Sequence, residues 1–321
     1  MTVPATTTLD ALVRAVRDVP DSTLRFDDGG HYRVEIPSVE GPAAFDAVVD
    51  EAARLDVPLH RVSQGSGIML LRDADITAMA ATGAAHGIEV CLFVGPRAPW
   101  QAVAAPLTPD GKLFGWRHMS VAALGHAYDD VVRACELGIR SVLVADEGLI
   151  TLLADGRATG TLPNDLVIKA SAVLGIANPL GAAMIHHAGA DTINVSSDIP
   201  LGELAAFRTA LPAPIDLYIE SPDNLGGFMR YHELPELVRV AAPIHLKYGL
   251  RNAPNIYPSG AHLEAAAIAT GRERVRRAAI GMEVLSRHSP SAGWNASPTG
   301  RARRGTPSPA STVGADPGPA T

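Results

Sequence analysis

The sequence predicts a (β/α)8 barrel, because strand-like and helix-like segments alternate eight times over about 250 residues. Glycines at Gly87, Gly138 and Gly189 each stand between a helical run and the next strand, as C-cap glycines do. A doubly wound open sheet is the alternative, but it would need a glycine-rich phosphate turn after the first strand. The loop at that place reads SVEGPAAF, which is not such a turn. We therefore expect a closed barrel.

Each predicted strand is a short run rich in β-branched and apolar residues, and each predicted helix carries apolar residues at helical spacing. Between the fourth and fifth strands, the apolar first half of 147–164 predicts a short helix. The expected strands are 33–39, 59–63, 89–95, 141–146, 165–171, 191–197, 215–221 and 243–249. The other expected helices are 41–56, 73–87, 120–138, 178–190, 201–211, 232–242 and 262–287.

Composition divides the chain into three parts. Residues 1–29 are expected to form an N-terminal helical extension, and residues 30–288 the barrel. From 289 to 321 the chain is rich in Pro, Ser, Gly, Ala and Thr, with almost no large apolar residues, which predicts a disordered tail. The long loop 95–119 carries Trp100 and Trp116, and we expect it to form a lid or a part of the barrel mouth.

Charge and cysteine content exclude several classes of partner. The net charge is −7 and no basic patch contains interleaved aromatic residues, which argues against nucleic acid binding. No apolar run approaches the ~18 residues that span a bilayer, and because the first thirty residues contain no apolar h-region, we expect no secretory signal. The only two cysteines, Cys91 and Cys135, favour a reduced, cytoplasmic protein and are too few for an iron–sulfur cluster. Apolar residues on the outer helices make a homodimer plausible.

Lysine is rare in this chain, since only three of its 27 basic residues are lysines. Two of them, Lys169 and Lys247, lie inside predicted strands among apolar neighbours. The pKa of a buried lysine shifts readily, which suits it to catalysis. The alternatives are a structural ion pair inside the fold, or an arginine bias of the genome.

Alternation along the strands places several charged residues toward the barrel interior, near the strand ends where barrel enzymes hold their active sites. Lysines and carboxylates that share a cavity shift each other's pKa and support proton transfer. The predicted catalytic residues are Lys247, Glu220, Lys169 and Glu35, with Arg61 and Asn194 as inward substrate-binding residues. Arg33, Asp216 and His245 lie nearer the strand starts and are the expected members of a buried salt-bridge layer.

The loops after the seventh and eighth strands predict a site for an anionic group. Such loops often bind anions through backbone N–H groups. The alternative is that their glycines only form tight turns. The expected binding residues there are Asp223, Asn224, Gly226, Gly227, Arg251 and Asn252, with Gln64 after the second strand. The arginines of the last helix, Arg272, Arg274, Arg276 and Arg277, are expected to form a solvated face.

No metal-ligand spacing of the HxH, HExxH or CxxC type occurs, and no cofactor is evident. Glu220 and Asp223 could still hold Mg²⁺ together with substrate oxygens, because Mg²⁺ needs few protein ligands.

Several segments resemble a bacterial branch of the collagenase-like peptidase family, the thirty-second family of peptidases with unassigned mechanism. They are RVEIPSVEGP, HRVSQGSG, EVCLFVGPRA, VADEG, GADTINVSSD and the run from YIESPDNLGG to NIYPSG, within 33–260. The resemblance implies a barrel-type domain and peptidase activity. Some members carry an iron–sulfur cluster and take part in hydroxylation of RNA or quinone precursors, but this chain lacks the cysteines for it. No catalytic residue is carried over.

Three functions follow as hypotheses. The first is an enzyme that uses lysine and glutamate for acid–base chemistry on an anionic or amide- or carbonyl-containing substrate, a small molecule or a short peptide. Within it, a Schiff-base lyase or aldolase would act on a small keto acid or phosphorylated metabolite. The second is a peptidase in which Glu220 activates water. The third is a barrel that binds a ligand without catalysis.

Overall fold

The computed structural model describes residues 8–95, 108–109, 111, 115–298, 300 and 308–309. Eight parallel strands, β2 to β9, form a closed barrel in chain order, so the predicted fold class is confirmed. Each strand pairs with its sequence neighbours, and β9 closes the barrel on β2. The strands are β2 (Tyr32–Pro37), β3 (Arg61–Gln64), β4 (Glu89–Phe93), β5 (Ser141–Val144), β6 (Val167–Ala170), β7 (Thr192–Asn194), β8 (Ile215–Glu220) and β9 (Ile244–Tyr248).

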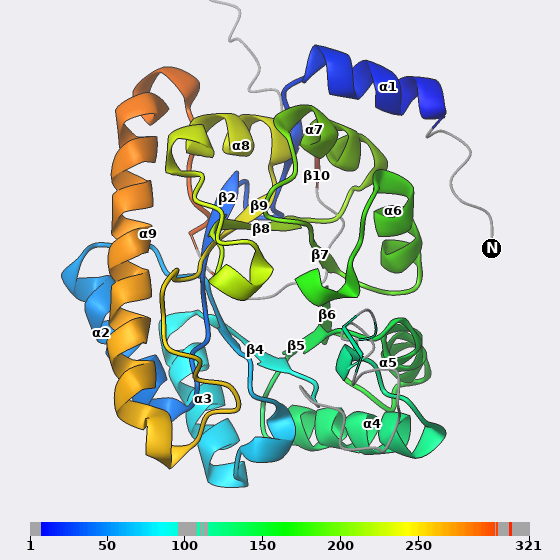
Figure 1. The fold of residues 1–321 in the computed structure, drawn as a ribbon, viewed down its shortest axis with the longest axis vertical. Coiled ribbons are helices and arrows are strands. Elements are labelled where there is room, and N and C mark those ends of the chain that lie inside the picture. The colour runs from blue at the N-terminus through cyan, green and yellow to red at the C-terminus, as the bar shows by residue number, and fades with distance from the viewer. Residues whose placement is uncertain are drawn as a thin grey trace, which may run out of the picture.

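Helices follow the strands and surround the barrel (Figure 1). The short helix expected after the fourth strand is longer than predicted and becomes α5. The helices are α2 (Pro42–Arg54), α3 (Asp73–His86), α4 (Val121–Glu136), α5 (Glu147–Thr159), α6 (Pro179–His187), α7 (Leu201–Ala210), α8 (Leu234–Ala241) and α9 (Glu264–Ala292). Within the described ranges, no helix has both the length and the apolar composition needed to cross a membrane.

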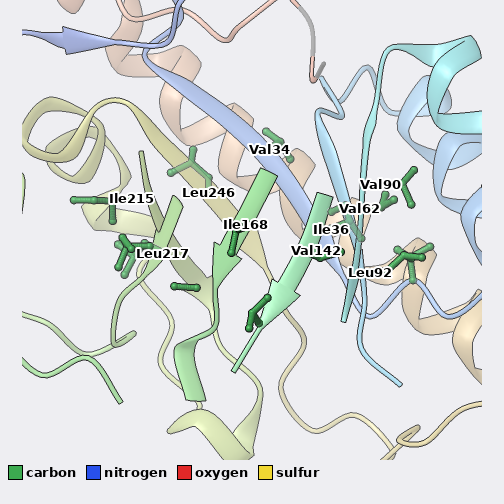
Figure 2. Close-up of a cluster of buried hydrophobic side chains, with 14 of the residues drawn as sticks. Val34, Ile36, Val62, Val90, Leu92, Val142, Ile168, Ile215, Leu217 and Leu246 are labelled. Carbon is green, nitrogen blue, oxygen red and sulfur yellow. The ribbon is translucent and has the colours of Figure 1, made fainter. Parts of the chain in front are cut away.

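The core lies between the strands and the helices, because alternate strand residues point outward. In β2, Val34 and Ile36 are fully buried among the apolar side chains drawn in Figure 2. The contact between β9 and α9 is close: a Cβ added at Gly281 would lie 2.1 Å from the Tyr248 hydroxyl. The intervening strand residues point into the barrel, and most of them are polar.

The N-terminal extension contains α1 (Leu9–Asp18), which packs against α7. Thr8 caps the helix by accepting the Ala11 N–H, and Leu12 and Ala15 are its buried residues. After α1, the short strand β1 (Leu24–Arg25) pairs antiparallel with β10 (Ser308–Pro309). This pairing joins two segments that are far apart in the sequence, 24–25 and 308–309.

The chain keeps contacts with the barrel for several residues beyond 289, where the tail was predicted to start. Helix α9 continues to Ala292. Asn295 accepts the His31 N–H, and Ser297 donates its own N–H to the Tyr32 carbonyl. These bonds tie the segment to the start of β2, which composition alone does not reveal. Residues 301–307 and 310–321 of the predicted tail lie outside the described part of the chain.

His60 fixes this segment to the barrel as a neutral imidazole. Its Nδ1 accepts the Val34 N–H at 2.9 Å, which requires that this nitrogen carry no proton. Its Nε2 donates to the Ser297 carbonyl at 2.7 Å. Burial lowers the pKa of His60 to about 4. Protonation of the folded protein would therefore break the bond to Val34.

We expect stability to fall as the pH drops from 6.5 to 4, because the unfolded chain binds a proton at His60 in this range and the folded chain does not. The full effect of this group is on the order of 3 kcal/mol, with maximal stability above pH 6.5. His60→Gln keeps hydrogen-bonding groups without titrating and should reduce the slope, while His245, whose pKa burial also lowers to about 4, retains its own share. Urea denaturation at several pH values measures the effect. The exposed His86→Gln is the control, and an unchanged slope in His60→Gln would contradict the assignment.

Candidate active site

The C-terminal ends of the barrel strands surround a cavity of about 400 Å³. Lys247 of β9, Asn194 of β7 and Tyr218 of β8 line its inner part. Asp223 and Asn224, in the loop after β8, lie at its wall. Of the predicted site residues, the cavity therefore brings together Lys247, Asn194, Asp223 and Asn224. Trp116, from the predicted mouth loop, also lines it, whereas Trp100 lies outside the described residues.

Below the cavity, the barrel interior holds a network of three cations and three carboxylates. Arg61 binds Glu89 at 2.7 Å, Asp216 at 2.9 Å and Glu35 at 3.3 Å. Lys169 contacts Glu35 directly and lies 3.8 Å from Asp216. Lys247 lies 3.6 Å from Glu35 and is the third cation, so the formal charges balance.

The cations of this network hold two carboxylates in their ionised form. Burial opposes the ionisation of Glu35, but the charges of Lys169, Lys247 and Arg61 outweigh it and hold its pKa well below the usual range. Burial likewise opposes the ionisation of Asp216, whose pKa is held low by Lys169, Arg61 and His245. Asp216 does belong to the salt-bridge layer predicted for it. His245 Nδ1 lies 2.8 Å from Asp216, but burial lowers the pKa of His245 to about 4, so it joins this layer as a neutral imidazole at pH 7.

Lys247 is the member of the network that reaches the cavity. With the Asn194 amide oriented to satisfy its hydrogen bonds, Oδ1 accepts from Lys247 Nζ at 2.7 Å and Nδ2 donates to the Asp216 carbonyl at 3.0 Å. The ammonium also lies 4.2 Å from the centre of the Tyr218 ring. The side chains of Asn194, Tyr218 and Glu35 therefore hold the Lys247 ammonium at the floor of the cavity.

Lys169, Glu35 and Arg61 point into the barrel as predicted, but they do not line the cavity. Lys169 and Glu35 are fully buried, and Arg61 is 1% exposed. Ser63 donates to Glu35 at 2.7 Å, which completes the surroundings of that carboxylate. These three residues thus lie one layer below the place where a substrate would bind, in the structural ion-pair arrangement that the sequence left as the alternative for Lys169.

Glu220 was expected to face the barrel interior, and this is wrong. The register shifts between Tyr218 and Glu220, and Glu220 pairs with Tyr248, whose side chain packs outward on α9. A bulge of this kind reverses the alternation of a strand. The carboxylate accepts from the Tyr231 hydroxyl at 2.6 Å and from the Arg251 N–H at 3.0 Å. It therefore lies outside the cavity and is not paired with Lys247.

The loops after β8 and β9 bind each other, so their backbone donors do not form the anion site that was predicted. Asp223 accepts the Asn252 N–H at 2.6 Å and the Arg251 Nε–H at 3.1 Å. Gly227 allows this approach, because a Cβ there would lie 2.9 Å from Arg251 Nε. Gly226 is in the left-handed region at φ 96° and donates its N–H to the Asp223 carbonyl. These glycines serve the turn.

Gln64 also has a local role. Its amide accepts the Gly67 N–H at 3.2 Å and donates to the Gly67 carbonyl at 3.4 Å, which closes the loop after β3. It does not line the cavity. The predicted contact of Gln64 with substrate therefore has no support in this geometry.

Sequence reasoning missed Arg274, which was assigned to a solvated face of the last helix. In the structure it is 5% exposed and lines the cavity. The helical spacing of the sequence could have indicated that Arg274 lies on the buried face of the last helix. Arg274 lies seven residues after Ala267 and three after Gly271, and both belong to the buried stripe of α9.

The described residues contain no group of three or more His, Cys, Asp and Glu side chains arranged to hold a metal ion. Glu220 and Asp223, the residues suggested for Mg²⁺, both accept hydrogen bonds from the Arg251–Asn252 backbone. Binding of Mg²⁺ together with substrate oxygens stays a prediction.

Comparison with known proteins gives no family. No family description matches the sequence, and neither does any curated protein. Solved structures do match. A U32 peptidase superposes with a TM-score of 0.38 and 18% identity, over 59% of this chain and 69% of that one. The likeness to the peptidase family read from the sequence therefore stays a resemblance.

Other solved structures match at the same level. A thiamine phosphate pyrophosphorylase from Pyrococcus furiosus gives a TM-score of 0.42 at 11% identity, over 80% of this chain and 98% of that one. The 2,3-dimethylmalate lyase, described as a member of the PEP mutase/isocitrate lyase superfamily, gives 0.42 at 12% identity, over 88% and 89%. Likenesses this weak carry no argument about activity, which has to come from the site itself.

Proposed function

We propose that this chain is an enzyme whose active site is the cavity at the barrel mouth, with Lys247 as the acid–base residue. The observation that carries this proposal is that Lys247 lines the cavity while its ammonium stays part of the charged network below. An ammonium fixed at the base of a cavity is suited to donate a proton, or a hydrogen bond, to a substrate oxygen. The substrate would be a small molecule with a carbonyl group.

The neighbours of Lys247 favour this role. Asn194 Oδ1 and the Tyr218 ring hold Nζ in one position, and an oriented donor needs little rearrangement during a reaction. When the ammonium transfers one proton to a carbonyl oxygen, a neutral amine remains next to Glu35. Lys169 and Arg61 keep their contacts with Glu35, and the network carries a net charge of −1 until Lys247 takes up a proton again.

A Schiff-base reaction is the second candidate, favoured by the position of Lys247 at the cavity. Lys169 and Lys247 both lie next to Glu35, and the amine of a lysine that lines the cavity is a nucleophile for a carbonyl carbon. The neutral Lys247 amine would attack the carbonyl carbon, water would leave, and an imine would form. Hydrolysis by a water that Glu220 activates has no support, because the carboxylate of Glu220 lies outside the cavity.

Borohydride trapping distinguishes the two candidates. The protein is incubated with a panel of aldehydes and 2-oxo acids, with and without borohydride, and followed by intact mass and by NMR of the substrates. A reduced adduct on Lys247 would establish the Schiff-base form. Product without an adduct, lost in Lys247→Met, would establish the acid–base form. If no compound is converted, but several raise the melting temperature, the proposal fails in favour of a non-enzymatic binder.

A further inference from the structure

Arg274 is a buried guanidinium without a carboxylate partner at the wall of the cavity. Its Nη1 donates to the Thr270 hydroxyl at 3.1 Å. Its Nε is buried and has no hydrogen-bond partner among the described residues. Among the described residues, no Asp or Glu oxygen lies within 4.0 Å of an Arg274 guanidinium nitrogen, the distance at which an ion pair forms. A buried donor left without a partner destabilises a protein unless a ligand or water completes it.

Nearby carboxylates do not take this place. Glu40 accepts from the Gly65 and Ser66 N–H groups, and Glu220 accepts from Tyr231. Both carboxylates raise the pKa of Arg274 from a distance, but burial is the larger effect and lowers it. The side chain is thus a desolvated cation for which the described part of the chain supplies no counterion in direct contact.

We propose that Arg274 binds a carboxylate group of the substrate, which would make the substrate a small carboxylic acid with a carbonyl within reach of Lys247. This inference rests on the proposed function and names the substrate class of the same site. Arg274 lines the cavity, and a guanidinium is the group that forms paired hydrogen bonds with a carboxylate.

The charges around the cavity favour a carboxylate over a phosphate. The network below is balanced, and Asp223 is paired with Arg251, so among the described residues that line the cavity Arg274 is a cation without a paired acid. One negative charge matches it. A phosphate dianion would bring a second negative charge toward Asp223, Glu40 and Glu220, which raises the free energy of the complex.

Calorimetric titration and thermal melting test the inference with acetate, pyruvate and 2-oxobutyrate, and with inorganic phosphate for comparison. We expect at least one carboxylate to bind saturably and more tightly than phosphate. Arg274→Met should weaken this binding by about tenfold or more, and Arg274→Lys by less, because it keeps the charge and loses the paired donors. Arg272→Met, which removes an exposed arginine of the same helix, is the matched control and should bind as wild type.

Three results would overturn the inference. They are no saturable carboxylate binding by the wild type, tighter binding of phosphate, or wild-type affinity in Arg274 variants whose circular dichroism is unchanged. If Arg274→Met does not fold, the decision rests on Arg274→Lys. The experiments distinguish a failure of this inference from a failure of the proposed function. Carboxylate binding that depends on Arg274, with no chemistry at Lys247, would refute only the function. Conversion of neutral aldehydes by Lys247, without carboxylate binding, would refute only this inference.

Discussion

Replacing Lys169 by methionine is expected to destabilise the fold by about 3–5 kcal/mol, the cost of removing one partner from a buried ion pair. Lys169 is fully buried and contacts Glu35, which is fully buried as well. Without the ammonium, the charges of the network sum to −1, and Glu35 retains Arg61 at 3.3 Å and Lys247 at 3.6 Å. Urea denaturation at pH 7, followed by circular dichroism, measures the loss.

A second substitution tests whether the loss of stability in Lys169→Met comes from the unbalanced charge of the Glu35 carboxylate. Lys169→Met combined with Glu35→Gln removes both charges, so we expect the double variant to be more stable than Lys169→Met alone. Arg276→Met is the control, because it breaks an exposed pair with Glu273 on α9 and should leave stability unchanged. A loss below about 1 kcal/mol in Lys169→Met would show that the network does not hold the barrel interior together.

Replacing Lys247 by methionine should affect the chemistry far more than the fold. Removing a general acid lowers the rate by about 10²–10⁴-fold. Stability should fall less than in Lys169→Met, because Glu35 then keeps its direct contact with Lys169 and its bond to Arg61. The measurement is kcat for a substrate found in the trapping screen, alongside denaturation of the same sample.

Glu220→Gln is the informative comparison, since the sequence made this residue a catalytic partner of Lys247. Its carboxylate binds Tyr231 and the Arg251 N–H outside the cavity, so we expect kcat to be retained. Loss of kcat in Glu220→Gln but not in Lys247→Met would restore the sequence-based assignment and contradict the site described above.

The site residues were predictable only as far as strand alternation holds. It placed Lys169, Lys247 and Asn194 inside the barrel, because in a regular strand the side-chain direction follows from position alone. It could not rank them by depth. Lys247 reaches the cavity while Lys169 lies beneath it, and that order depends on the stagger between neighbouring strands, as in the pairing of Lys169 with Thr192 and of Lys247 with Glu35.

What the sequence determined by itself is the order of eight strands and helices, since local periodicity and helix-ending glycines encode it within each segment. Tertiary structure decided the rest. A bulge in β8 turned Glu220 outward, and the packing of α9 on the barrel brought Arg274 to the cavity. Backbone bonds from Asn295 and Ser297 held a segment whose composition suggested disorder. Each of these outcomes depends on contacts between residues far apart in the chain, which no local pattern records.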